Sequence, residues 1–172
     1  MTHRFRDENL PGMNPIQPGR LTAAFDRPLV VFLIGMRINR FHRIAKWLPV
    51  ARAMAPMIAE LSQNPDSGFL GAETMLSGLR TVILLQYWRN FASLEGYARA
   101  RDKSHWPAWT AFNRAVGTDG SVGIFHETYV VDRGASETIY VNMPRFGLGK
   151  VQGTTAATGS RDASRSRMRG EE

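Results

Sequence analysis

Two titratable residues, His126 and Glu127, stand side by side in the apolar segment GIFHETYVV, residues 123–131. The Ile, Phe, Tyr and Val around them are typical of a buried strand, in which successive side chains point to opposite faces. His126 and Glu127 therefore face opposite sides and do not form a catalytic dyad with each other. Because both faces are mostly apolar, each polar group needs a partner or a function.

Each of the two residues has a catalytic and a structural interpretation. His126 is either a ligand or general base, since a neutral imidazole serves both roles near neutral pH, or a core histidine bonded to a neighbouring element. Glu127 is either catalytic or paired with an arginine of another strand, for which the sequence offers Arg37, Arg80 and Arg89. We expect His126 to face a cavity and Glu127 to face the helix layer.

Further polar residues fall within the same expected sheet. Glu73, Gln86 and Arg37 lie among apolar neighbours in strand-like segments. A few polar groups in an apolar surrounding are typical of a small-molecule site, and equally of a polar network across a dimer interface. His105 stands at a predicted helix start, where it either donates into a cavity or lies exposed. Trp88 and the other aromatics have the spacing of core residues.

The period of the apolar pattern changes repeatedly along residues 28–133. It predicts a strand over 29–38, a helix within 40–65, strands over 67–77 and 80–89 joined by SGLR, helices within 90–117, and a last strand over 123–131. In the first helix, Pro49 predicts a break or kink near residues 46–48 and Pro56 predicts a boundary, and Asn64 and Pro65 predict its end. Asn90 is the expected N-cap of the next helix.

This order predicts an α+β fold of the ferredoxin-like split βαβ type, with an antiparallel four-stranded sheet and helices on one face. Such a sheet leaves one apolar face uncovered. A second copy of the chain covers it at least cost, so we expect a homodimer with the sheets packed face to face.

Composition sets the outer limits of this interpretation. The chain has 172 residues, 43% of them hydrophobic, and no cysteine, which excludes disulfides and thiolate metal sites and favours the cytoplasm. No apolar run reaches the roughly 20 residues of a membrane helix. The net charge of +7 is partly carried by the ends, so we expect no nucleic-acid partner. We expect an irregular lead-in over 1–27, one domain over 28–150 and a disordered basic tail over 151–172.

Three short motifs carry a resemblance to a known family. They are SHWPAW, GIFHETY and YVNMPRFGLG, within a stretch that covers about residues 28–150. This stretch resembles the DUF4188 monooxygenase-like family of the dimeric α+β barrel superfamily. The resemblance implies a monooxygenase-like oxidoreductase that acts on a small apolar molecule in the barrel cavity.

HETYVV and YVNMPRFGLG are also similar, more distantly, to motifs of haem-dependent aldoxime dehydratases, which are built on the same barrel. That likeness implies that His126 is the proximal haem ligand. It places Asn142, Met143 and Arg145 at the border of the site, with Arg145 binding a haem propionate or a substrate carboxylate. The distal histidine of those enzymes falls at or near Met143, which cannot transfer protons, so the dehydratase mechanism does not carry over unchanged.

Several functions remain open at this stage. One is an oxidoreductase with haem on His126, and another is a cofactor-free oxygenase in which Trp88, Asn142 or His105 positions an electron-rich substrate. The alternatives are an aldoxime-dehydratase-like haem lyase, a protein that binds haem or a lipophilic ligand without catalysis, and a purely structural role for the polar residues.

Overall fold

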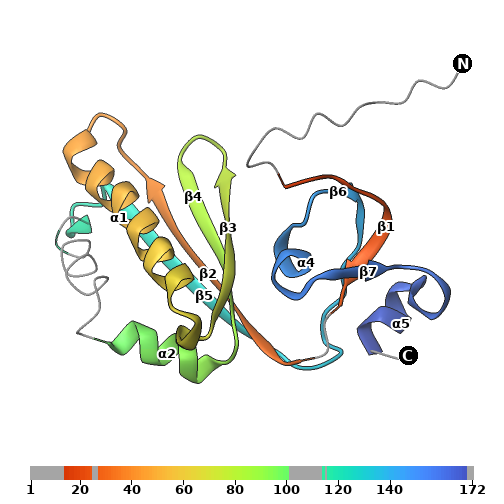
Figure 1. Ribbon diagram of the computed structural model, residues 1–172. Helices are drawn as coiled ribbons and strands as arrows, with labels where there is room; N and C mark the ends of the chain where they lie inside the picture. Colours follow the sequence, from red (N-terminus) through yellow and green to blue (C-terminus); the bar gives the residue numbers. More distant parts are fainter. Residues whose placement is uncertain (1–13, 25–26, 101–113, 115, 170–172) are drawn as a thin grey trace, which may run out of the picture. The chain divides into compact units, whose positions relative to one another are not determined.

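In the computed structural model, the described part of the chain comprises residues 14–24, 27–100, 114 and 116–169. The chain forms two compact units. The sheet unit consists of residues 26–136, and the end unit combines residues 1–25 with 137–172. Figure 1 labels the elements of both.

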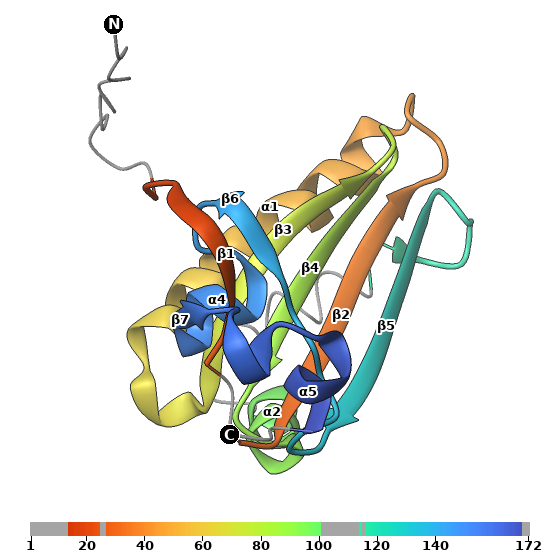
Figure 2. The ribbon, with the colours of Figure 1, turned by 90° about the vertical axis from the view of Figure 1, so that its right-hand side faces the viewer.

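The sheet unit contains a four-stranded antiparallel sheet in the order β3-β4-β2-β5 (Figure 2). Its strands are β2 (Leu29–Ile38), β3 (Phe69–Ser77), β4 (Thr81–Trp88) and β5 (Val122–Val131). Its helical elements with described bounds are α1 (Ile44–Gln63), η1 (Pro65–Ser67) and α2 (Phe91–Arg99). This order and pairing confirm the predicted ferredoxin-like α+β fold. The second helix expected after His105 lies outside the described residues.

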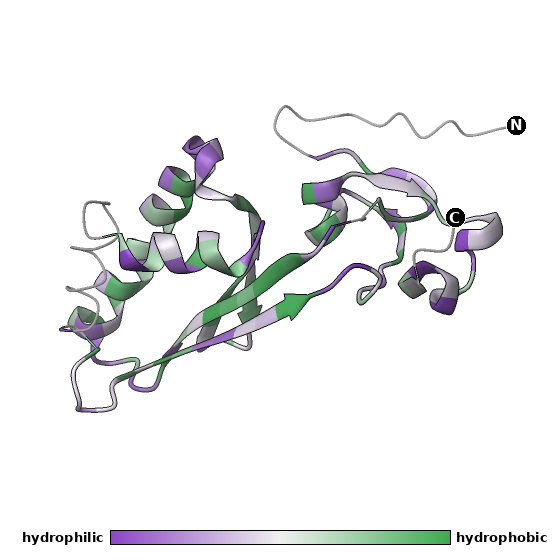
Figure 3. Cartoon of the chain, turned by 90° about the horizontal axis from the view of Figure 1, so that it is seen from below, coloured by the Kyte–Doolittle hydropathy of each residue, from purple (hydrophilic) through white to green (hydrophobic). Residues whose placement is uncertain are grey.

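Helices α1 and α2 cover one face of this sheet. Val30 and Trp88 pack with Leu61 of α1 and Leu94 of α2 in one cluster. Near the other end of the sheet, a second cluster joins Met36, Ile38, Val50 and Val122. Figure 3 shows the helices striped in hydrophobic and hydrophilic colours, as expected when one side of each helix is buried.

Helix α1 differs from its prediction in one respect. A break or kink was expected before Pro49 and a boundary near Pro56, but the helix runs as one element from Ile44 to Gln63 with both prolines inside. The apolar side of the helix, with Val50 and Leu61, is buried against the sheet. This packing outweighs the backbone hydrogen bonds that the prolines remove. The predicted end is confirmed, because Asn64 is the C-cap.

The predicted local signals at the other boundaries are confirmed. Gly78, with φ of 61°, forms the turn between β3 and β4, a conformation that glycine adopts without strain. The Asn90 side chain accepts a hydrogen bond of 2.8 Å from the backbone N–H of Ser93 at the start of α2. At the end of α2, burial and the negative charge of Glu60 raise the pKa of Tyr97 to about 12.

The end unit is a three-stranded sheet in the order β6-β1-β7 with short helices. Its elements are β1 (Gln17–Ala23), β6 (Tyr140–Met143), α4 (Gly147–Gln152), β7 (Thr154–Ala156), η2 (Gly159–Arg161) and α5 (Ser164–Arg169). The structure thus corrects two expectations: the lead-in over 1–27 contains a strand, and the tail over 151–172 contains β7 and α5. The expected domain boundary at 150 also differs, because residues from Glu137 onward cluster with the end unit.

The two ends are ordered by contacts between residues far apart in the sequence. The side chain of Arg167 of α5 is 6% exposed and forms an ion pair with Glu137. Arg20 of β1 pairs with Asp162 and also donates to its backbone carbonyl. Composition alone could not predict that these segments are ordered. A polar segment that cannot form its own core can still be ordered by ion pairs and hydrogen bonds with residues elsewhere in the chain. Among the described residues, no helix is long and apolar enough to cross a membrane.

Candidate active site

His126 lies on the face of the sheet that α1 covers. The strand register places it beside Ile34 of β2, which pairs with Leu84 of β4, which pairs with Thr74 of β3. Side chains in register on antiparallel strands point to the same face, and neighbouring strands are about 4.8 Å apart. Thr74, Leu84, Ile34 and His126 therefore form one row across this face, which we call the histidine row.

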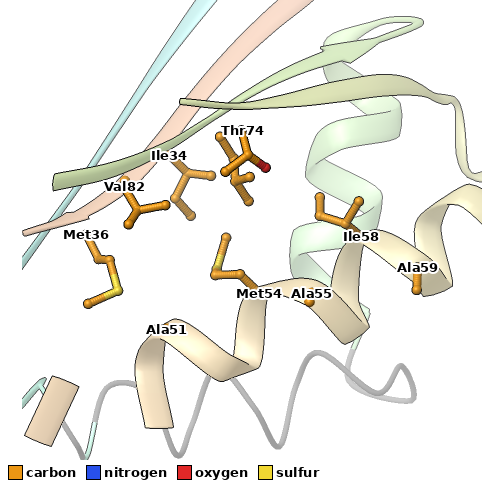
Figure 4. Close-up of a pocket in the computed structure, with 11 residues that line it drawn as sticks. Ile34, Met36, Ala51, Met54, Ala55, Ile58, Ala59, Thr74 and Val82 are labelled. Carbon is orange, nitrogen blue, oxygen red and sulfur yellow. The ribbon is translucent and has the colours of Figure 1, made fainter. Parts of the chain in front are cut away.

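The other three members of the histidine row line a cavity between α1 and the sheet (Figure 4). Its volume is about 470 Å³. The lining is almost wholly apolar: Ile34, Gly35, Met36, Ala51, Met54, Ala55, Ile58, Ala59, Thr74, Val82 and Leu84. Small alanines of α1 face the strands, so the helix leaves space above the sheet. The space suits a small apolar molecule, with the Thr74 hydroxyl as a polar group at its edge.

His126 is not among the residues that line the cavity, but it is the register neighbour of Ile34, which is, and its imidazole is exposed. Its ring centroid lies 5.8 Å from that of Phe32, with the planes inclined by 41°. Within the described residues, no group forms a hydrogen bond with the imidazole. The interpretation of His126 as a satisfied core histidine therefore has no support in the described part of the chain, where no group occupies its ring nitrogens.

Glu127 occupies the opposite face, which corrects the expectation that it faces the helix layer. Its register neighbours are Leu33, Leu85 and Glu73, and none of these lies on the side that α1 covers. The carboxylate is exposed and accepts a hydrogen bond of 2.5 Å from the hydroxyl of Tyr129. This hydrogen bond and the negative charge of Glu127 raise the pKa of Tyr129.

The expected arginine partners of Glu127 are engaged elsewhere. Arg37 donates to the Thr81 hydroxyl at 3.3 Å, and Arg80 donates to the Asn39 carbonyl at 3.0 Å. Arg89 donates to the Pro65 carbonyl at 3.3 Å. Among the described residues, Glu127 therefore has no arginine partner, and its carboxylate is bonded to the Tyr129 hydroxyl instead.

Gln86 was expected among the polar residues of a possible site and Trp88 among the core aromatics, and the structure places both in the helix-covered core. Trp88 is 0% and Gln86 5% exposed. The indole N–H donates to the Gln86 side-chain oxygen at 2.9 Å, so the two satisfy each other. Neither lines the cavity. Glu73 points to the other face, in register with Leu85.

The remaining candidates belong to the end unit or are not described. Asn142 has φ of 51°, a conformation that Asn tolerates better than most residues. Its Oδ1 accepts a 2.9 Å hydrogen bond from the Gly19 backbone N–H, beside an irregularity in the pairing of β1 with β6. Met143 is 40% exposed, and the Arg145 carbonyl accepts from the Asn14 side chain. His105 lies outside the described residues.

The cavity itself was not predicted. Its signal in the sequence is the spacing of small residues in α1, at 51, 55 and 59, which places three alanines on one side of a helix. Small residues on a helix face indicate either close packing or an open space, and only the helix-to-sheet geometry decides between them.

The described residues fit a haem in part. His126 supplies an imidazole of the right type beside an apolar cavity, as an axial ligand requires. No charged side chain is among the residues that line the cavity, whereas haem propionates are bound mostly by cations. Arg145, the predicted propionate partner, belongs to the end unit. The described residues therefore offer an imidazole for the iron and an apolar surface for the porphyrin, and the cavity lining offers no cation for the propionates.

The family description of the Monooxygenase af470-like proteins matches residues 29–148, which include all four strands of the sheet and every residue of the cavity lining. The chain belongs to the Monooxygenase af470-like family. The match confirms the predicted membership of a monooxygenase-like family, and it extends into the end unit as far as α4.

A curated member of this group, Monooxygenase af470 of Aspergillus fumigatus, is 26% identical over 131 residues, which are 71% of this chain and 46% of that protein. The chain thus spans about half the length of this relative. Two solved aldoxime dehydratases have the same fold. One, crystallised with butyraldoxime, has a TM-score of 0.61 at 16% identity and covers 96% of this chain and 47% of that one. The other has a TM-score of 0.56 at 20% identity, and the match covers 98% of this chain and 47% of the dehydratase.

Proposed function

We propose that the protein is an oxygenase-type oxidoreductase that oxidises a small apolar molecule in the cavity between α1 and the sheet. The observation that carries the proposal is the histidine row: three of its members line the cavity, and the fourth, His126, brings an imidazole to its edge. Membership of the Monooxygenase af470-like family supports the reaction class.

In the form that needs no cofactor, the substrate supplies the electrons. An activated methylene group flanked by aromatic or carbonyl groups loses a proton to the His126 imidazole, and the resulting carbanion reduces molecular oxygen. Overall, the methylene carbon exchanges its two C–H bonds for one C=O bond, and the second oxygen atom leaves as water with the two hydrogen atoms. The apolar lining holds the substrate and excludes bulk water, and the imidazole accepts and returns the proton.

Oxygen uptake with anthrone as an electron-rich apolar probe tests this form. We expect one molecule of oxygen consumed per ketone formed, and a loss of about 100-fold or more in His126→Ala, in line with the usual contribution of a general base. Glu127→Ala is the matched control, because it changes the adjacent residue on the other face. Equal rates in wild type and His126→Ala would refute a role for the imidazole. Binding of the probe without turnover would assign the cavity to ligand storage.

A second candidate is a haem-dependent enzyme with His126 as the axial ligand. The exposed imidazole, free of hydrogen bonds from described residues, favours it. Haem would supply redox chemistry at iron, for an oxidation or an aldoxime-dehydratase-like elimination. After purification with added haem, this candidate requires a Soret band that disappears in His126→Ala and persists in His42→Ala, an exposed histidine before α1. Absence of the band in wild type would exclude it.

We also propose that two copies of the chain pack through the sheet face opposite the helices. On this face the Phe125 ring lies so close to Gly35 that an added Cβ would stand 2.4 Å from it, and the next register neighbours are Ile83 and Met75. Apolar residues of this kind gain about 25 cal/mol per Å² on burial. Light scattering should give twice the mass of one chain for wild type and the mass of one chain for Phe125→Glu. A wild-type monomer at micromolar concentration would refute the dimer.

A further inference from the structure

Four large apolar side chains are exposed at one end of the sheet unit. Leu79 is 94% and Leu76 75% exposed, both at the turn between β3 and β4. Ile44 is 54% and Phe41 41% exposed, where the chain passes from β2 into α1. Single exposed apolar residues are ordinary, but a group of them at one end of a molecule indicates an interaction surface.

Contacts between the two segments make this end one surface, which we call the basic tip (residues 37–46 and 76–81). The Ile38 backbone N–H donates to the Arg80 carbonyl at 2.7 Å. The Arg80 guanidinium donates to the Asn39 carbonyl and lies 4.8 Å from the centre of the Phe41 ring. Figure 2 shows the β3–β4 turn and the loop between β2 and α1 at the same end.

The charge of the basic tip is strongly positive. It contains five basic residues and no acidic one: Arg37, Arg40, Arg43, Lys46 and Arg80. All four arginines are exposed. Among the described residues, Asp119 in the turn before β5 forms an ion pair with this surface, 3.9 Å from Arg43. Hydrogen bonds from Ser121 lower the pKa of Asp119, which therefore stays ionised and offsets only one of the five cations.

We propose that the basic tip binds the surface of a membrane rich in anionic lipid. Arginines pair with lipid phosphate groups, and the exposed leucines at the turn enter the boundary between headgroups and acyl chains. A nucleic acid would engage the same cations but would leave Leu76 and Leu79 in water, so the apolar residues favour a lipid surface. The attachment is peripheral and does not depend on the proposed reaction.

Co-sedimentation with vesicles tests the proposal on the full chain. The two probes are phosphatidylcholine vesicles with and without about one-third phosphatidylserine. We expect binding to the anionic vesicles, weakened by salt. Arg40→Gln with Arg43→Gln should reduce it roughly 30-fold, because each cation near such a surface contributes roughly fivefold. Leu79→Glu should reduce it about tenfold or more. Arg52→Gln, an exposed arginine of α1 outside the basic tip, is the matched control.

Circular dichroism of each variant shows that the fold is retained, as expected for surface residues. Failure of the wild-type protein to bind anionic vesicles, or equal binding to neutral ones, would overturn the proposal. So would unchanged binding by Leu79→Glu, which would reduce the basic tip to a general polyanion site. If Leu79→Glu converts a wild-type oligomer into a smaller species, the basic tip is a contact between copies and the proposal also fails.

Discussion

Filling the cavity should make the protein more stable and less able to bind its ligand. Ala55 of α1 lines the space of about 470 Å³ between the helix and the sheet. In Ala55→Leu, three more carbon atoms enter this space, and helix propensity changes little because Ala and Leu are both strong helix formers. A substitution that raises stability and lowers ligand affinity together is expected only where a cavity is kept open for a ligand.

The expected gain follows from the number of added carbons. At about 0.8 kcal/mol per buried CH2, three carbons give at most about 2.4 kcal/mol. Ala55 is itself exposed to solvent within the cavity, so only part of the new side chain leaves water. Taking half gives about 1 kcal/mol, which corresponds to a rise in Tm of roughly 2–4 °C for a chain of this size.

The assay pairs thermal melting with titration of anthrone followed by fluorescence. Ala45→Leu, on an exposed position of the same helix outside the cavity lining, is the control and should change neither readout. If Ala55→Leu binds the probe as tightly as wild type, the cavity is not the binding site. If it destabilises the protein by more than about 1 kcal/mol, the side chain is overpacked and the space is smaller than described.

Three further outcomes test the core and the end unit. Gln86→Leu should lower the free energy of unfolding in urea by about 1–3 kcal/mol, because the buried Trp88 N–H loses its acceptor, and a neutral effect would contradict that hydrogen bond. The pKa of Tyr97 is raised from 10.0 to about 12, so the folded state favours the protonated hydroxyl. The free energy of unfolding should therefore be unaffected by this group below pH 10 and should fall as the pH rises through 12. Tyr97→Phe should remove this fall from a profile of stability against pH. Arg167→Ala should lower the free energy of unfolding of the end unit by about 2–3 kcal/mol. This is less than for a fully buried ion pair, because the Glu137 side chain is 26% exposed. Unchanged amide hydrogen exchange in β7 would show that α5 does not stabilise the end unit.

The sheet could be predicted because its strands are encoded locally. The continuous apolar run over residues 29–38 gave the bounds of β2 without error, and Gly78 and Asn90 marked a turn and a cap by their side-chain chemistry alone. The effect of the prolines in α1 was misjudged because tertiary packing can outweigh low helix propensity, and the local sequence pattern carries no information on that packing. The order of the end unit was missed for the same reason. Its contacts, such as Gly19 with Asn142, join residues 123 positions apart.

The candidate site was predicted only in part. Alternation correctly placed His126 and Glu127 on opposite faces, but alternation is symmetric and cannot say which face the helices cover. That information lies in the register of β5 with β2, where His126 pairs with Ile34. The contribution of Glu127 to stability was overestimated as well. Its carboxylate is exposed and bonded to the Tyr129 hydroxyl, so it has none of the desolvation cost of a buried unpaired charge.

The alternation along β5 gives its two faces separate roles in the proposals made above. His126 belongs to the face that borders the cavity, whereas Phe125, Glu127 and Tyr129 belong to the face proposed to meet a second copy. Because a side chain reaches only one face, His126→Ala should abolish turnover at constant oligomeric mass. Phe125→Glu should lower the mass measured by light scattering to that of one chain, and it should affect turnover only through the loss of the dimer. If instead Phe125→Glu abolishes turnover in a protein that remains dimeric, the reacting molecule lies between the sheets of the two copies. The residue to examine next is then Glu127, whose carboxylate accepts a hydrogen bond from the Tyr129 hydroxyl.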